Sequence, residues 1–184
     1  MNLEKNEVVL SKDQYSNVVP IKKFILYYIF SFGVYFLYWA YKSWSLIKKE
    51  KKLNIWVLPR TIFGVFFIGS LGRNVLNIAK EYGYTKTYNS TVIFIIFFLI
   101  NLVTRRAPEP YDMVYILGFV PLLPIVEASN FYWSSKNPEL KVNNKFSVIS
   151  IILMIIGGLL LSVNFIPDSD NAPKKNISIN EEIE

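Results

Sequence analysis

The sequence predicts an all-α, multi-pass integral membrane helix bundle with four to five hydrophobic segments, and three observations lead to this class. Of the 184 residues, 52% are hydrophobic and 16% aromatic, whereas only 18% are charged, compared with about a quarter in ordinary globular chains. Three apolar runs of 18 to 20 residues contain no charged side chain, which suits a hydrocarbon core about 30 Å thick. Lysines and arginines flank these runs, so membrane contact explains the net charge of +6 better than nucleic-acid binding does.

A polar N-terminal tail of mixed charge, 1–20, precedes a membrane domain predicted to cover 21–165. The first segment, 24–44, opens with 18 uncharged residues. As a helix these would be about 27 Å long, so one crossing is predicted. Its aromatic residues are of the kind that lies at the membrane interface, where an apolar ring meets water through its OH or NH: Tyr38, Trp39, Tyr41 and Trp44.

The second segment, 55–72, is weaker because Pro59 and Arg60 lie inside it and three glycines loosen it. An arginine at the centre of a crossing helix costs about 2.5–3.5 kcal/mol on insertion scales. A short, interrupted run favours an in-plane or re-entrant helix over a crossing, and both alternatives stay open.

The third and fourth segments, 88–104 and 113–133, are joined by a short, proline-containing turn that favours an antiparallel pair. Pro121 and Pro124 lie within the fourth segment. Each proline removes a backbone donor, so this stretch is expected to pack against protein rather than lipid.

The fifth segment, 146–165, is the longest uncharged run in the chain. Gly157, Gly158 and Ser162 give it small residues at helical spacing, which is typical of close helix packing in membranes. The polar C-terminal tail, 166–184, is expected to be disordered. If all five segments cross, lysines and arginines divide evenly between the two faces, so the positive-inside rule assigns no orientation.

Arg60 and Glu127 form a candidate polar pair in or near the membrane. A charged group in hydrocarbon raises the free energy of the protein unless it is paired with an opposite charge or hydrated. The two side chains would therefore either meet or extend to water at the interface. A meeting of the two would favour a small-solute or ion translocator.

Enzymatic activity and cofactor binding are not predicted. The chain has no cysteine and no histidine, which removes disulfides, Cys/His metal sites and Ser-His or Cys-His nucleophile pairs. It also has no P-loop and no dinucleotide fingerprint.

A Gly-x-Tyr-x-x-Tyr-Trp pattern begins at Gly33. It resembles the first helix of a family of small, uncharacterised bacterial membrane proteins with a domain of unknown function. Weaker similarity follows at 59–63, 121–124 and 144–158. At Glu127 the chain departs from the family that it resembles, because the resemblance implies an uncharged amide at this position. The resemblance implies a multi-pass protein of the bacterial inner membrane and supplies no activity.

These observations together predict a non-enzymatic integral membrane protein of the inner (cytoplasmic) membrane. Its expected partners are the lipid bilayer and other membrane proteins or copies of itself. Nucleic acid is not an expected partner. It is expected to act through helix–helix or protein–protein contacts in the bilayer. The alternative is the translocator that uses Arg60 and Glu127.

Overall fold

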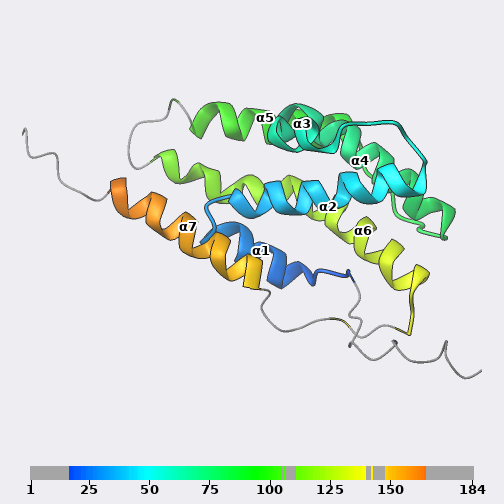
Figure 1. The fold of residues 1–184 in the computed structure, drawn as a ribbon. Coiled ribbons are helices and arrows are strands. Elements are labelled where there is room, and N and C mark those ends of the chain that lie inside the picture. Colours follow the sequence, from blue (N-terminus) through cyan, green and yellow to red (C-terminus); the bar gives the residue numbers. More distant parts are fainter. Residues whose placement is uncertain (1–16, 105, 107–110, 140–141, 143–147, 165–184) are drawn as a thin grey trace, which may run out of the picture.

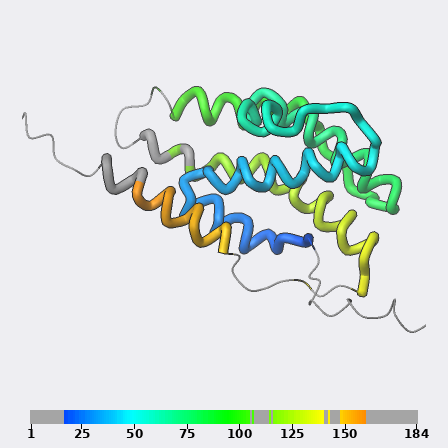
Figure 2. The backbone as a smooth tube through the Cα atoms, in the orientation of Figure 1, coloured from blue at the N-terminus to red at the C-terminus, as the bar shows by residue number. Residues whose placement is uncertain are grey.

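The computed structural model describes residues 17–104, 106, 111–139, 142 and 148–164, and every regular element within them is a helix. The predicted all-α class is therefore confirmed for these residues. The helices form an elongated bundle (Figure 1). The tube in Figure 2 shows that the chain runs back and forth along the long axis of this bundle. The tail predicted at 166–184 and most of that at 1–20 lie outside the described residues.

The first predicted segment, 24–44, is interrupted. The chain forms two helices, α1 (Ile21–Phe30) and α2 (Val34–Glu50), with a short turn between them. Figure 1 shows that the two helices run side by side in opposite directions. The prediction of one continuous helix over 24–44 is therefore wrong, because these residues form a helical hairpin.

Aromatic rings hold the two arms of this hairpin together. The ring centroids of Phe24 and Trp39 are 5.4 Å apart, and those of Tyr27 and Tyr35 are 4.7 Å apart. Antiparallel helices produce this pattern, in which contacting residues draw closer in sequence toward the turn. Such ring pairs contribute about 0.5–1.5 kcal/mol each beyond their burial.

The turn follows from three residues, Ser31, Phe32 and Gly33. Phe32 and Gly33 have φ values of 52° and 80°, in the left-handed region that glycine adopts without strain. Their amides donate to carbonyls of the last turn of α1 at 3.1 and 2.9 Å, the Schellman arrangement that ends a helix. Ser31 Oγ accepts the Tyr35 N–H at 2.8 Å. Backbone groups at the break therefore find hydrogen-bond partners locally, as buried backbone groups generally do.

The second predicted segment, 55–72, is also divided. A six-residue helix, α3 (Val57–Ile62), is followed at Phe63 by α4 (Gly64–Glu81). The chain reaches α3 from the end of α2, and α4 returns to that same end of the bundle (Figure 1). The chain therefore reverses direction between α3 and α4.

The other three segments correspond to helices close to the predicted positions. α5 covers Ser90–Thr104, and α7 covers Val148–Asn164. Between them, a 3-10 helix, η1 (Tyr111–Leu122), continues into α6 (Leu123–Lys136). Pro121 and Pro124 lie at this junction. Each lacks a backbone N–H donor, which suits a change of helix type.

Among the described residues, one helical stretch, Ile116–Lys136, is long and apolar enough to cross a membrane by length and composition. Two further helices, Ser90–Thr104 and Val148–Leu159, are apolar but shorter. One such stretch fits the predicted membrane association, whereas four to five crossings do not follow from helix length.

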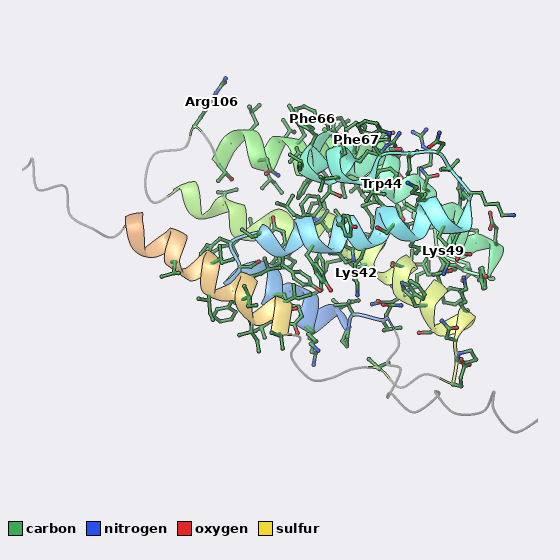
Figure 3. All side chains as sticks on the ribbon, in the orientation of Figure 1. Lys42, Trp44, Lys49, Phe66, Phe67 and Arg106 are labelled. Atoms are coloured by element: carbon green, nitrogen blue, oxygen red, sulfur yellow. The ribbon has the colours of Figure 1, made fainter. Side chains whose placement is uncertain are left out.

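Lysines gather at one end of the bundle. Figure 3 shows Lys49 near one end and Arg106 at the other. The end near Lys49, called the basic end below, contains the C-terminal parts of α2, α4 and α6 and the loops after α2 and α4. Its lysines in these elements are Lys48, Lys49, Lys51, Lys52, Lys80, Lys86 and Lys136.

Candidate functional site

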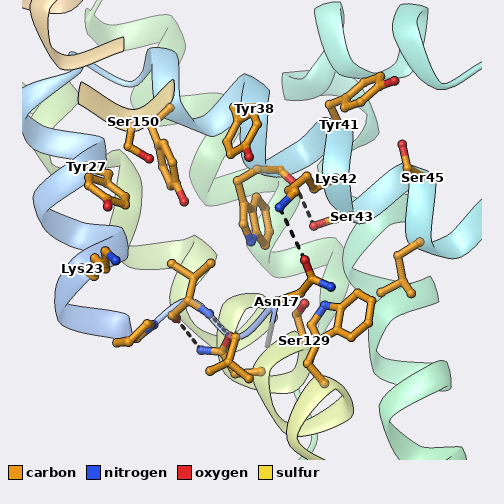
Figure 4. Close-up of a pocket in the computed structure, with 18 of the residues that line it drawn as sticks. Asn17, Lys23, Tyr27, Tyr38, Tyr41, Lys42, Ser43, Ser45, Ser129 and Ser150 are labelled. Atoms are coloured by element: carbon orange, nitrogen blue, oxygen red, sulfur yellow. Dashed lines mark hydrogen bonds between the residues drawn. The ribbon is translucent and has the colours of Figure 1, made fainter. Parts of the chain in front are cut away.

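A cavity of about 760 Å³ lies beside the hairpin, toward the basic end. Its walls come from α1, α2, α6, the first turn of α7 and residues 17–20 (Figure 4). Four of the lining residues are lysines and one is a glutamate, so positive charge prevails among them. The rest of the lining is rich in tyrosine and tryptophan.

Two of the lysines approach the cavity from the two arms of the hairpin. The amino group of Lys23 on α1 lies 5.6 Å from the ring centroid of Tyr27, and that of Lys42 on α2 lies 5.5 Å from that of Tyr38. Figure 4 shows both amino groups turned toward the cavity. Lys42 also donates to Asn17 Oδ1 at 3.5 Å. The hairpin thus places in the lining of one cavity two cations that 18 uncharged residues separate in sequence.

The wall formed by residues 17–20 is held in place by Asn130 of α6. Asn130 Oδ1 accepts the Val19 N–H at 2.9 Å, and Asn130 Nδ2 donates to the Val19 carbonyl at 2.7 Å. One side-chain amide therefore satisfies both backbone groups of a residue in a segment that precedes the first helix. These two bonds position Asn17 at the cavity.

An ion pair occupies the cavity wall at the basic end. Lys136 Nζ donates to Glu50 Oε1 at 2.5 Å and to Tyr132 Oη at 2.7 Å. The hydrogen bond from Lys136 lowers the pKa of the Glu50 carboxyl, although partial burial acts in the opposite direction. The carboxylate therefore neutralises one lysine, and positive charge remains in excess among the lining residues.

Arg60 and Glu127 are not brought together. The guanidinium carbon of Arg60 lies 4.9 Å from the ring centroid of Trp44 and 5.3 Å from that of Phe67, a stacked cation–π arrangement. Glu127 instead pairs with Lys86 at 2.5 Å. Of the two alternatives for this candidate pair, the structure does not show the direct meeting, because each side chain has a partner of another kind.

The four aromatic residues predicted for the membrane interface divide into two groups. Trp39 and Trp44 are only 5% and 1% exposed, so both rings pack in the core and are not at the protein surface. Tyr41 is 47% exposed, and Tyr38 is half-buried in the cavity wall. Phe24 of α1 packs against Trp39, whereas Arg60 of α3 lies over the ring of Trp44.

The predicted packing residues of α7 also differ from one another. A Cβ at Gly157 would lie 2.6 Å from the carbonyl carbon of Ser31, so α7 meets the hairpin turn at a glycine. A Cβ at Gly158 would have no heavy atom within 4 Å. The side chain of Ser162 lies outside what the structure describes.

Local sequence patterns do not single out Lys23, Lys42, Glu50 or Lys136 as site residues. The available signal was the near-equal distance of Lys23 and Lys42 from the Ser-Phe-Gly turn, which places both at one level once a hairpin is assumed. The pairing of Glu50 with Lys136 joins residues 86 positions apart and has no local signal.

No family model, curated protein or solved structure matches this chain. The resemblance to a family of bacterial membrane proteins therefore stays a prediction.

Proposed function

We propose that this chain is a non-enzymatic integral membrane protein of a bacterial cytoplasmic membrane that crosses the bilayer three times and acts through contacts within it. The crossings would be α5, the stretch formed by η1 and α6, and α7. The two remaining elements, the α1–α2 hairpin and the α3–α4 segment, would enter and leave on the same side.

The observation that carries this proposal is the apolar outer surface of α5 and α7. Soluble proteins rarely expose large continuous apolar patches, whereas a bilayer covers them. Nine aliphatic side chains on these two helices are between 47% and 71% exposed: Val92, Ile95, Leu99, Val103, Val148, Ile149, Ile152, Ile155 and Leu159.

The dimensions of the hairpin support entry to half the membrane depth. Lys23 and Lys42 lie nine and ten residues from Phe32, which is about 14 Å of helix in each direction, or half of the hydrocarbon core. The turn contacts Gly157, near the middle of α7. A hairpin whose tip meets the middle of a crossing helix would end near the centre of the bilayer.

This path also supports an orientation. With no crossing before α5, the lysines of the basic end all lie on one side, together with residues 17–23. Arg106, which follows α5 at the opposite end of the bundle from Lys49 (Figure 3), would then lie on the other side. The positive-inside rule then favours a cytoplasmic basic end.

A translocator that uses Arg60 and Glu127 is the alternative raised by the sequence. Their separate partners, an aromatic stack for Arg60 and Lys86 for Glu127, give it no support.

Single cysteines at Asn17, Lys49, Lys80 and Arg106 test the proposal, because the chain contains no native cysteine. A membrane-impermeant maleimide should label position 106 in intact spheroplasts and the other three only after permeabilisation. Labelling of positions 17 and 49 from opposite sides would refute the re-entrant hairpin. Labelling of all four positions without permeabilisation, with the protein in the soluble fraction, would refute membrane insertion.

A further inference from the structure

We propose that the cavity beside the hairpin binds the phosphate group of an anionic membrane lipid, with Lys23 and Lys42 as its cationic contacts. The inference rests on the proposed membrane position of the chain. It adds a ligand class and a binding site to that position.

The depth of the cavity matches the phosphate level of a bilayer. Lys23 and Lys42 directly flank the uncharged stretch 24–41, so both amino groups would lie where hydrocarbon gives way to headgroups. Lysines with long apolar stems favour this level. The lipid phosphate occupies the same level, which makes it the anion present there at the highest concentration.

The chemistry of the lining suits a singly charged phosphate on an amphiphile. Positive charge exceeds negative charge among the lining residues. The amide of Asn17 lies within 3.5 Å of the Lys42 amino group and adds a polar contact. Tyrosine and tryptophan rings, among them Tyr38 and Trp133, also line the cavity. Such rings hold the boundary between a charged headgroup and its acyl chains.

Acyl chains of a bound lipid would have apolar surface beside the cavity on α1 and α7, two helices that contact each other. Ser150, in the first turn of α7, lines the cavity. The neighbouring side chains Ile149 and Ile152 on α7 and Leu26 on α1 are 37% to 49% exposed. An acyl chain that follows these residues would cover apolar surface that the protein itself leaves open, whereas a free phosphate ion would not.

Native mass spectrometry of the full-length protein in detergent can test this site with phosphatidylglycerol and phosphatidylcholine of identical acyl chains. The double variant Lys23→Gln/Lys42→Gln removes the two proposed contacts. Its matched control, Lys51→Gln/Lys52→Gln, removes the same charge from the basic end outside the cavity. We expect the wild type and the control to prefer phosphatidylglycerol, and the cavity variant to lose about tenfold or more of its affinity.

Two results would overturn the proposal. Equal losses in both double variants would show general attraction to a basic surface. Displacement of phosphatidylglycerol by an equal concentration of inorganic phosphate would show that the ligand is soluble. If the double variant is not monodisperse, Lys42→Gln and Lys42→Arg give the same test, with loss of binding expected only for Lys42→Gln. Binding in detergent does not depend on orientation, so failure here is distinguishable from failure of the maleimide experiment.

Discussion

Replacing Gly157 with alanine is expected to destabilise the protein, whereas the same change at the neighbouring Gly158 is not. The new methyl group at position 157 would lie 2.6 to 2.7 Å from the carbonyl carbon, Cα and carbonyl oxygen of Ser31. Ser31 is fully buried and begins a turn with two left-handed residues, so its backbone cannot move away cheaply.

The magnitude follows from overpacking at one site and helix propensity at the other. Overpacking in a well-packed core costs about 1–3 kcal/mol. At Gly158 the methyl group meets no heavy atom within 4 Å, and exchanging a helical glycine for alanine gains roughly 0.5–1 kcal/mol. The two variants should therefore differ by about 2 kcal/mol or more, on the order of 5 °C in melting temperature.

Thermal melting of the full-length protein in detergent, followed by the loss of the monodisperse peak in size-exclusion chromatography, measures this difference. Gly158→Leu is a further control, because the space beside Gly158 is open and this bulky change is expected to be tolerated. Equal melting temperatures for Gly157→Ala and Gly158→Ala, or a larger loss at Gly158, would refute the contact between α7 and the hairpin turn.

Three further changes have defined outcomes. Asn130→Asp removes the donor to the Val19 carbonyl, should cost about 1–3 kcal/mol, and should accelerate limited proteolysis at residues 17–20; unchanged proteolysis would contradict the double hydrogen bond. Arg60→Lys keeps the charge but loses the planar stack, so a stability loss of about 0.5–2 kcal/mol is expected by thermal melting; an equally stable variant would show that charge alone suffices. The lowered pKa of Glu50 means that its ion pair stabilises the fold above the ordinary glutamate pKa and is lost as pH falls through the lowered value. Glu50→Gln should therefore melt earlier than wild type near neutral pH, by at most about 1 kcal/mol, and the difference should vanish in acid; a pH-independent difference would contradict this.

The class of the fold and the positions of the later helices could be predicted from local patterns. Long uncharged runs, proline positions and flanking charges act over a few turns, so α5, α6 and α7 lie close to their predicted ranges. The hairpin was not predicted because an uncharged run has the same hydrophobicity whether it forms one straight helix or two antiparallel helices. Ser31 and Gly33 were the available signal for a break, but a glycine or serine is also tolerated within a crossing helix.

The site could not be predicted because it depends on that break. A continuous helix over 24–44 would hold Lys23 and Lys42 apart, whereas the hairpin makes both line one cavity. Arg60 and Glu127 were matched by charge alone, and the structure gives Arg60 aromatic partners that charge patterns do not indicate. Pairs such as Lys136 with Glu50 depend on tertiary packing.

The distance between residues 23 and 42 tests the hairpin most directly. Spin labels on the double variant Lys23→Cys/Lys42→Cys, with the full chain in lipid nanodiscs, report this distance by double electron–electron resonance. Because both residues line one cavity, we predict a distance far below the roughly 28 Å that a continuous helix over this interval imposes. A distance near that of the continuous helix would contradict the hairpin, and with it the one-sided basic end and the lipid site.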